Sequence, residues 1–311
     1  MSVDRVGSFA TTQLMLSQMQ RAQVALDTSS RQVASGKRAD TYAGYGESTA
    51  IMEAARSASA HADAHFQAAQ QASTRLDLQD AQLTQLSTLS AQIRQMLTTA
   101  AANGDGTALM DQLEGLFDQA TEIFNSRDSS GYIYGGDNNQ TPPVTVSSLS
   151  DLAALPSVSD AFANGSVKLS VRVGDNRTVE VGLLASEIGT DLMSLFQQIA
   201  QFDAGVNGPF PAGVTTPTQQ NFLESTIATA SSVGAGVNAQ AATNGIRYNS
   251  VQLWMDQLKS SSIIHKDFVS SIEDVDIAEA LARLNQNQLQ LQASFQIGAK
   301  LNQMSLLDYL P

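Results

Sequence analysis

Residues 12–36, TQLMLSQMQRAQVALDTSSRQVASG, contain the pattern that decides the fold. Apolar or small residues recur there at intervals of three and four, which is the spacing of a helix face that packs against another helix. These positions are Thr12, Met15, Met19, Ala22, Leu26, Ser29 and Val33. Gly36 follows, and glycine readily adopts the left-handed conformation that ends a helix. The sequence therefore predicts a helix over residues 8–36 with one face for a partner.

The same spacing returns at the other end of the chain, in a helix predicted from about residue 271 to residue 307. The positions that keep it are Ile277, Leu281, Leu284, Gln288, Leu291, Phe295 and Gly298. We expect the two terminal helices to pack against each other, against neighbouring copies of the chain, or both. The residues predicted to form this assembly interface are Met15, Met19, Leu26, Val33, Ile277, Leu281, Leu284, Leu291 and Phe295.

Helical periodicity also fills the regions next to both ends. It predicts helices over residues 47–102, 107–127 and 218–266. The segment Asn103-Gly104-Asp105-Gly106 lies between the first two of these helices and indicates a turn that separates them.

The middle of the chain has a different pattern. Val167–Val173 alternates apolar and polar residues, Asp175-Asn176 favours a turn, and Thr178–Val181 favours a second strand. A β-hairpin is predicted here, followed by one helix over residues 186–202 and a linker rich in Pro and Gly over residues 206–217.

The predicted fold is mainly α with a small β-containing insert, arranged as an elongated helical bundle with paired N- and C-terminal helices. We expect five segments. Residues 1–42 and 269–311 form the terminal assembly helices, residues 43–140 and 217–268 form a bundle of long helices, and residues 141–216 form the β-containing insert at the surface.

Composition excludes several classes of protein. The net charge is −13, from 30 acidic and 17 basic residues, and no basic cluster offers a path for a nucleic acid backbone. The acidity also argues against anionic membrane surfaces, and no apolar run approaches the roughly 18 residues that span a bilayer. Cysteine is absent, which rules out disulfides and thiolate metal sites.

The N-terminal residues Met1–Gly7 lack the basic and apolar regions of a secretory signal peptide. The chain is therefore expected either in the cytoplasm or outside the cell after export by a route without a cleaved signal.

Short motifs that resemble reactive or binding sites have simpler explanations. His61 and His65 are four residues apart on a predicted helix, but no third metal ligand accompanies them. Gly234–Ala239 has the spacing of a dinucleotide-binding loop, yet helix instead of strand precedes it. Gly46–Ala50 lacks the last glycine of a nucleophile elbow. Asn103–Gly106 lacks the carboxylate alternation of a calcium loop. We expect no catalytic residue, cofactor or metal.

Three acidic residues lie where the last helix begins. Negative charge at Glu273, Asp274 and Asp276 complements the dipole at a helix N-terminus, and the sequence predicts that they cap the helix.

Several segments resemble the bacterial flagellins and the related flagellar hook-filament junction proteins, also called hook-associated protein 3. QVASGKR at residues 32–38 resembles the signature that ends the first helix of this family, and Lys37 favours the junction proteins over the flagellins. The segment GYIYGG at residues 131–136, with TPPV at residues 141–144, is similar to a junction-protein segment that flagellins generally lack.

Further similar segments follow in the family's order: VGAGVN at 233–238, DVDIAEA at 274–280, QLQAS at 290–294 and SLLDYL at 305–310. Two departures stand out, because Asp40–Gly46 replaces the usual continuation of the first signature and Ala239 replaces an arginine. The resemblance covers residues 1–140 and 218–311.

The resemblance implies a non-enzymatic, extracellular structural subunit of the flagellum, exported by the type III route and carried beforehand by an export chaperone. Its implied partners are other copies of itself, the first hook-associated protein and flagellin, and it would join the hook to the filament. A filament-forming flagellin is the alternative, which residues 132–144 oppose. An adhesin or enzyme that uses the insert is the second alternative.

Overall fold

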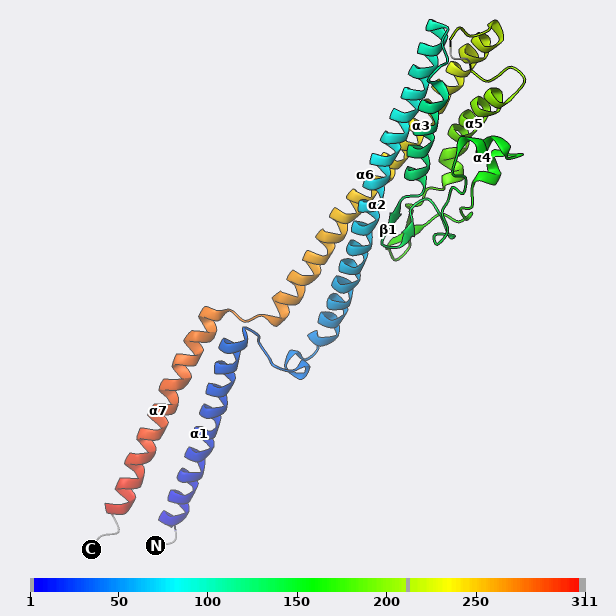
Figure 1. The fold of residues 1–311 in the computed structure, drawn as a ribbon. Coiled ribbons are helices and arrows are strands. Elements are labelled where there is room, and N and C mark those ends of the chain that lie inside the picture. The colour runs from blue at the N-terminus through cyan, green and yellow to red at the C-terminus, as the bar shows by residue number, and fades with distance from the viewer. Residues whose placement is uncertain (1–2, 211–212, 308–311) are drawn as a thin grey trace. The chain divides into compact units, whose positions relative to one another are not determined.

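A computed structural model describes residues 3–210 and 213–307, and most of these residues are helical (Figure 1). The α-helices are α1 (Val3–Ser35), α2 (Ser48–Asn103), α3 (Leu109–Phe124), α4 (Leu149–Ala154), α5 (Ala185–Ala204), α6 (Pro217–Glu273) and α7 (Ile277–Leu307). Two 3-10 helices are η1 (Tyr42–Tyr45) and η2 (Val158–Ala161), and the strands are β1 (Arg127–Asp128), β2 (Gly131–Tyr132), β3 (Ser170–Gly174) and β4 (Arg177–Glu180). The mainly α prediction is confirmed.

The chain forms two compact units. The first contains Met1–His61 and Ser260–Pro311, and the second contains Ala62–Lys259. Long helices α2 and α6 contribute residues to both. The five predicted segments divide the chain differently, and they stay a prediction.

In the first unit, α1 and α7 lie side by side and run in opposite directions (Figure 1). The prediction of paired N- and C-terminal helices is confirmed. Helix α1 ends where expected, because Gly36 has a φ of 71° and donates its N–H to the carbonyl of Gln32 at 2.9 Å. Residues 308–310 of the C-terminal motif lie outside the described residues.

The predicted boundary between the last two helices is wrong by several residues. Helix α6 continues to Glu273, beyond the expected end at residue 266, and α7 begins at Ile277, later than the expected residue 271. The break lies at Asp276, whose Oδ1 accepts hydrogen bonds from the N–H groups of Ala278 and Glu279 at 2.8 and 3.3 Å. An Asp at this position satisfies N–H groups that have no partner inside the helix.

The second unit has a continuous core of large apolar side chains. Helix α3 buries Leu113, Phe117 and Phe124, as its spacing predicts, and the Phe117 and Phe196 rings meet edge to face at 5.4 Å. Phe196 belongs to α5, whose bounds lie within two residues of the helix predicted over residues 186–202 of the insert. Because residues of the insert share this core, α5 is tied to α3 by packing.

The predicted turn between α2 and α3 is also confirmed. Gly104 has a φ of 66°, and Asp105 donates its N–H to the carbonyl of Ala100 at 3.2 Å, which closes the end of α2. The N–H of Thr215 donates to the Gly104 carbonyl at 2.7 Å, so the turn is attached to the segment before α6. Residues 211 and 212 of the predicted linker lie outside the described residues.

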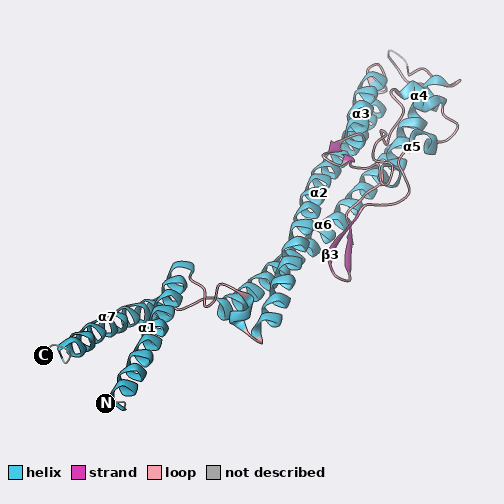
Figure 2. Cartoon of the chain, turned by 90° about the horizontal axis from the view of Figure 1, so that it is seen from below, coloured by secondary structure: helices cyan, strands magenta, loops and turns pink. Residues whose placement is uncertain are grey.

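The described strands form two small hairpins, drawn in magenta in Figure 2. Strands β3 and β4 confirm the predicted hairpin, although β3 begins at Ser170, and Val167 is largely exposed. Val173 and Val181 pack the hairpin onto α2 and α6. The guanidinium of Arg177 lies 3.7 Å from the centre of the Trp254 ring on α6, a cation–π contact. The sequence patterns did not predict α4, η2 or the small β1–β2 hairpin.

Candidate assembly surface

The contact between α1 and α7 follows the heptad spacing of both helices. On α1 the positions Met15 to Val33 that the sequence singled out face α7. On α7 the residues that face α1 are 280, 284, 287, 291, 294 and 298, which are again three and four residues apart. We call these residues the terminal seam: Met15, Met19, Ala22, Leu26, Ser29 and Val33 with Ala280, Leu284, Asn287, Leu291, Ser294 and Gly298.

Direct contacts fix the register of the terminal seam. Asn287 donates its side-chain N–H to the carbonyl of Ala25 at 3.1 Å and to the hydroxyl of Ser29 at 3.0 Å. Near the other end, Gly298 lies against Met15, because a β-carbon added at Gly298 would come within 2.5 Å of the Met15 Cε. A polar pair and a close glycine approach both favour one alignment of the two helices over shifted ones.

The predicted interface residues fall into two groups. Met15, Met19, Leu26, Val33, Leu284 and Leu291 are half-buried within the terminal seam. The remaining three are exposed outside the part of α7 that meets α1: Ile277 by 44%, Leu281 by 43% and Phe295 by 55%. Leu281 and Phe295 each follow a seam residue directly, so they extend the apolar face of α7 to one side.

Further large apolar side chains of α1 and α7 face water. With the three exposed predicted residues they form a set that we call the outer apolar residues: Leu14, Leu16, Val24, Ile277, Leu281, Leu289, Phe295 and Ile297. Sequence reasoning missed Leu14, Leu16, Val24, Leu289 and Ile297 because they do not fit a single heptad face. These exposed side chains are spread along both helices and around them, outside the face that α1 and α7 share.

A cluster of charges ties the segment after α1 to helix α2 and to the end of α6 within the first unit. Lys37, just after α1, places its Nζ 2.7 Å from Asp274 and 3.3 Å from Glu273. Arg56 of α2 contacts the same Glu273 at 2.7 Å. We call Lys37, Arg56, Glu273 and Asp274 the joint cluster. The prediction that Glu273 and Asp274 cap the last helix is wrong, because both carboxylates are held by cations from other segments.

The basic partners lower the pKa of both carboxyl groups. For Glu273 the main cause is the hydrogen bond from Arg56, and for Asp274 it is the hydrogen bond from Lys37. Backbone bonds reinforce the cluster, since Arg38 donates its N–H to the Glu273 carbonyl at 2.8 Å and Val275 donates to the Gly36 carbonyl at 3.0 Å. The residues of the sequence GKR at 36–38 therefore hold the junction between α6 and α7.

The segment GYIYGG at residues 131–136 has a packing role. Tyr134 is fully buried and donates its hydroxyl to Gln82 Oε1 at 2.7 Å, and burial raises the pKa of its phenol. Gly131 has a φ of 126°, and a β-carbon there would lie 2.5 Å from the carbonyl oxygen of Asn139. A glycine at position 131 therefore permits a close backbone approach where a side chain would not fit.

The other motifs weighed in the sequence lie in ordinary helical surroundings. Gly234 and Gly236 lie inside α6, and a β-carbon at Gly234 would be 3.6 Å from Ser90 of α2. His65 Nε2 lies 3.4 Å from an oxygen of Asp175. Among the described residues, no group of three or more His, Cys, Asp or Glu side chains is placed to hold a metal ion. No described helix is both long and apolar enough to cross a membrane.

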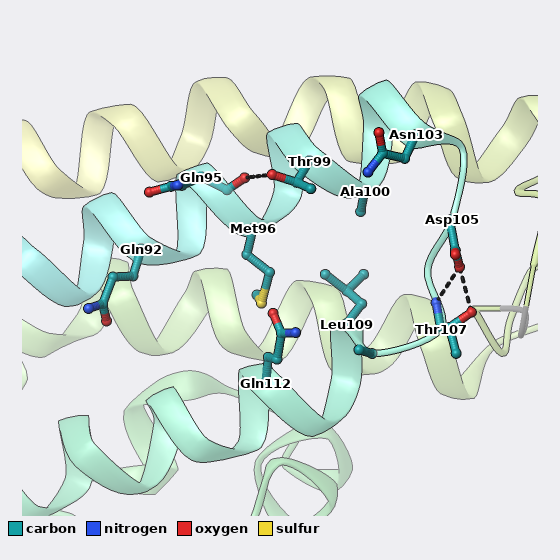
Figure 3. Close-up of a pocket in the computed structure, with 11 residues that line it drawn as sticks. Gln92, Gln95, Met96, Thr99, Ala100, Asn103, Asp105, Thr107, Leu109 and Gln112 are labelled. Atoms are coloured by element: carbon teal, nitrogen blue, oxygen red, sulfur yellow. Dashed lines mark hydrogen bonds between the residues drawn. The ribbon is translucent and has the colours of Figure 1, made fainter.

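A hollow of about 420 Å³ lies between the end of α2 and the start of α3 (Figure 3). Gln92, Gln95 and Gln112 bring amide groups to it, and Met96 and Leu109 add apolar surface. At its rim, the carboxylate of Asp105 accepts hydrogen bonds from the backbone N–H and the hydroxyl of Thr107, a local contact that stabilises the turn before α3 (Figure 3).

Comparison with known proteins defines the class to which this arrangement corresponds. Residues 227–310 match the family described as the bacterial flagellin C-terminal helical region. This segment contains most of α6 and all of α7, and therefore one half of the terminal seam. No curated protein sequence matches the chain significantly.

Solved structures with the same fold carry hook-associated names. One, described as flagellar hook-associated and from Vibrio parahaemolyticus, has 14% identity and a TM-score of 0.59, covering 73% of this chain and 97% of that one. FlgL of Xanthomonas campestris has 15% identity and a TM-score of 0.55, covering 70% and 99%. Flagellar hook-associated protein-3 of Legionella pneumophila has 11% identity and a TM-score of 0.53, covering 75% and 99%.

The C-terminal region of this chain is thus similar to the C-terminal helical region of bacterial flagellins. Over most of its length, the chain has the fold of flagellar hook-associated proteins. These findings confirm the resemblance that the sequence motifs indicate.

Proposed function

We propose that this chain is a structural subunit of the bacterial flagellum that joins the hook to the filament. The observation that carries the proposal is the pair α1 and α7, which keeps its large seam residues half-buried and leaves eight outer apolar residues exposed. A monomer gains nothing from apolar side chains in water, whereas a lattice of neighbouring helices buries them at about 25 cal/mol per Å².

The partners proposed are other copies of this chain, the first hook-associated protein on the hook side and flagellin on the filament side. Before export, a flagellar chaperone would cover the outer apolar residues. The proposed location is the flagellum outside the cell, reached by type III export without a cleaved signal, and the role requires no enzymatic activity.

A filament-forming flagellin is the second candidate, supported by the match of residues 227–310 to the flagellin C-terminal region. The packed segment around Tyr134 favours the junction role, because it is similar to a junction-protein segment that flagellins generally lack.

Immunogold electron microscopy of isolated flagella distinguishes the two candidates. An antibody against the insert, residues 141–216, is expected to label one point where the hook meets the filament. Label along the whole filament would establish the flagellin alternative. Flagella without label, from cells that produce the protein, would contradict both candidates.

A further inference from the structure

The chain contains four asparagines that are followed directly by glycine: Asn103, Asn164, Asn207 and Asn244. In such a pair the backbone nitrogen of the glycine can attack Cγ of the asparagine side chain. Glycine favours this attack because it has no β-carbon to obstruct the approach and the most mobile backbone. The four pairs share this local chemistry, so differences between them must come from the fold.

Two of these side chains are held in place. Asn244 is fully buried in α6 and donates its side-chain N–H to the carbonyl of Leu76 at 2.8 Å. Asn164 donates its side-chain N–H to the hydroxyl of Ser186 at 3.0 Å, and its Oδ1 accepts the Ser186 backbone N–H at 3.0 Å. Rotation of either amide toward the next backbone nitrogen would break these hydrogen bonds.

The other two side chains are not held. Asn103 is exposed at the last residue of α2, and Asn207 is exposed in the segment after α5. Within the part of the chain that the structure describes, neither side-chain amide makes a hydrogen bond. The last residue of a helix also samples other conformations at little cost in free energy, which applies to Asn103.

We propose that Asn103 is a site of spontaneous deamidation, that Asn207 is a second one, and that the fold protects Asn164 and Asn244. At Asn103 a bond forms between the Gly104 nitrogen and Cγ, the bond between Cγ and Nδ2 breaks, and ammonia leaves with the proton of the attacking amide. The cyclic imide then adds water. Opening at one carbonyl gives aspartate, and opening at the other gives isoaspartate.

The reaction at Asn103 would change the turn between α2 and α3 in the second unit. Isoaspartate lengthens the backbone by one methylene just before Gly104, whose carbonyl accepts the Thr215 N–H. Either product also adds a carboxylate to the hollow of Figure 3, which Asn103 and Asp105 both line. Both changes weaken the attachment of the α2–α3 turn to the segment before α6.

The test is to age the purified full chain in mildly alkaline buffer at physiological temperature and to follow the four pairs by peptide mass spectrometry. Asn103 and Asn207 are expected to lose their amides several-fold faster than Asn164 and Asn244. The same chain unfolded in urea should lose all four at similar rates. Folded chain in which Asn103 stays intact, or in which Asn164 or Asn244 reacts as fast as Asn103, would overturn the proposal.

The variant Asn103→Gln provides the matched control, because the longer side chain does not readily form the cyclic imide. Hydrogen exchange of the Thr215 amide is expected to accelerate in aged wild-type chain and to stay unchanged in aged Asn103→Gln chain. Equal acceleration in both would show that the turn loosens for another reason.

Discussion

The core of the second unit and the terminal seam of the first unit use helices in opposite ways. In the core, Phe117, Phe196 and Leu86 are completely buried, and aromatic rings meet edge to face. In the seam, full burial is confined to small residues such as Ala22 and Ser29, while the large side chains stay half-exposed. The core can stabilise its unit alone, whereas the seam leaves apolar area for another chain to cover.

The largest effect on stability is expected in the core of the second unit. Phe117→Ala removes a fully buried ring and leaves a cavity beside Phe196, which should lower the free energy of unfolding by about 3–5 kcal/mol. Urea unfolding followed by circular dichroism measures it. The control Leu116→Ala, at a half-buried position on the same helix, should cost clearly less, and equal losses would show that the core around Phe117 does not dominate the stability of this unit.

A smaller loss is expected from Tyr134→Phe. The variant keeps the ring but removes the hydroxyl that donates to Gln82 Oε1, leaving a buried acceptor unpaired. The expected loss is about 1–3 kcal/mol in the same unfolding measurement. Tyr132→Phe is the matched control, since Tyr132 is only partly buried, and it should change stability little. A neutral Tyr134→Phe would show that the hydroxyl pair does not stabilise this core.

The joint cluster should make the first unit sensitive to acid. Because the folded-state pKa of Glu273 and Asp274 is lowered, their contribution is fully present above the unfolded pKa values of about 4. It is lost as the pH falls through the lower folded values. The Val275 amide donates to Gly36, and its protection against hydrogen exchange, relative to the intrinsic rate at each pH, should fall progressively below about pH 5.

Glu273→Gln serves as the control for this pH effect. It removes one of the two carboxylates, so the acid dependence of the Val275 exchange should become shallower, at a stability loss below about 1 kcal/mol near neutral pH. An unchanged pH dependence would exclude the joint cluster as its source.

The smallest effect on the isolated chain is expected at the outer apolar residues. Leu281→Asp changes a side chain that already faces water, so the free energy of unfolding should shift by no more than about 0.5 kcal/mol. Assembly should nevertheless fail, because the charge would be buried against a partner. Swimming assays and electron microscopy of the flagella measure this outcome.

Leu284→Asp is the companion variant, since Leu284 lies in the terminal seam one turn further along α7. It should reduce the helix content of the isolated chain as well as block assembly. Normal swimming of the Leu281→Asp strain would contradict the proposed assembly surface, and loss of helix in that variant would place Leu281 in the seam instead.

Much of this architecture could be predicted from local sequence. The ends of α1 and α2 follow from Gly36 and Gly104, because a positive φ is a local requirement that glycine meets at no steric cost. The seam of α1 follows from its heptad spacing. The hairpin follows from alternation around Asp175-Asn176. The β1–β2 hairpin was missed because strands of two residues are too short to show a period.

Local sequence by itself predicts the long helices and the apolar positions on them, because a helix depends on neighbours three and four residues away, whereas the six-residue α4 is too short to show this period. Only the tertiary structure decided which apolar residues of α7 meet α1, placing Leu284 and Leu291 in the seam and leaving Leu281 and Phe295 exposed. It also decided that Glu273 pairs with Arg56, 217 residues earlier in the chain, instead of capping α7. Such pairings have no local signal, because they exist only after distant segments have packed together.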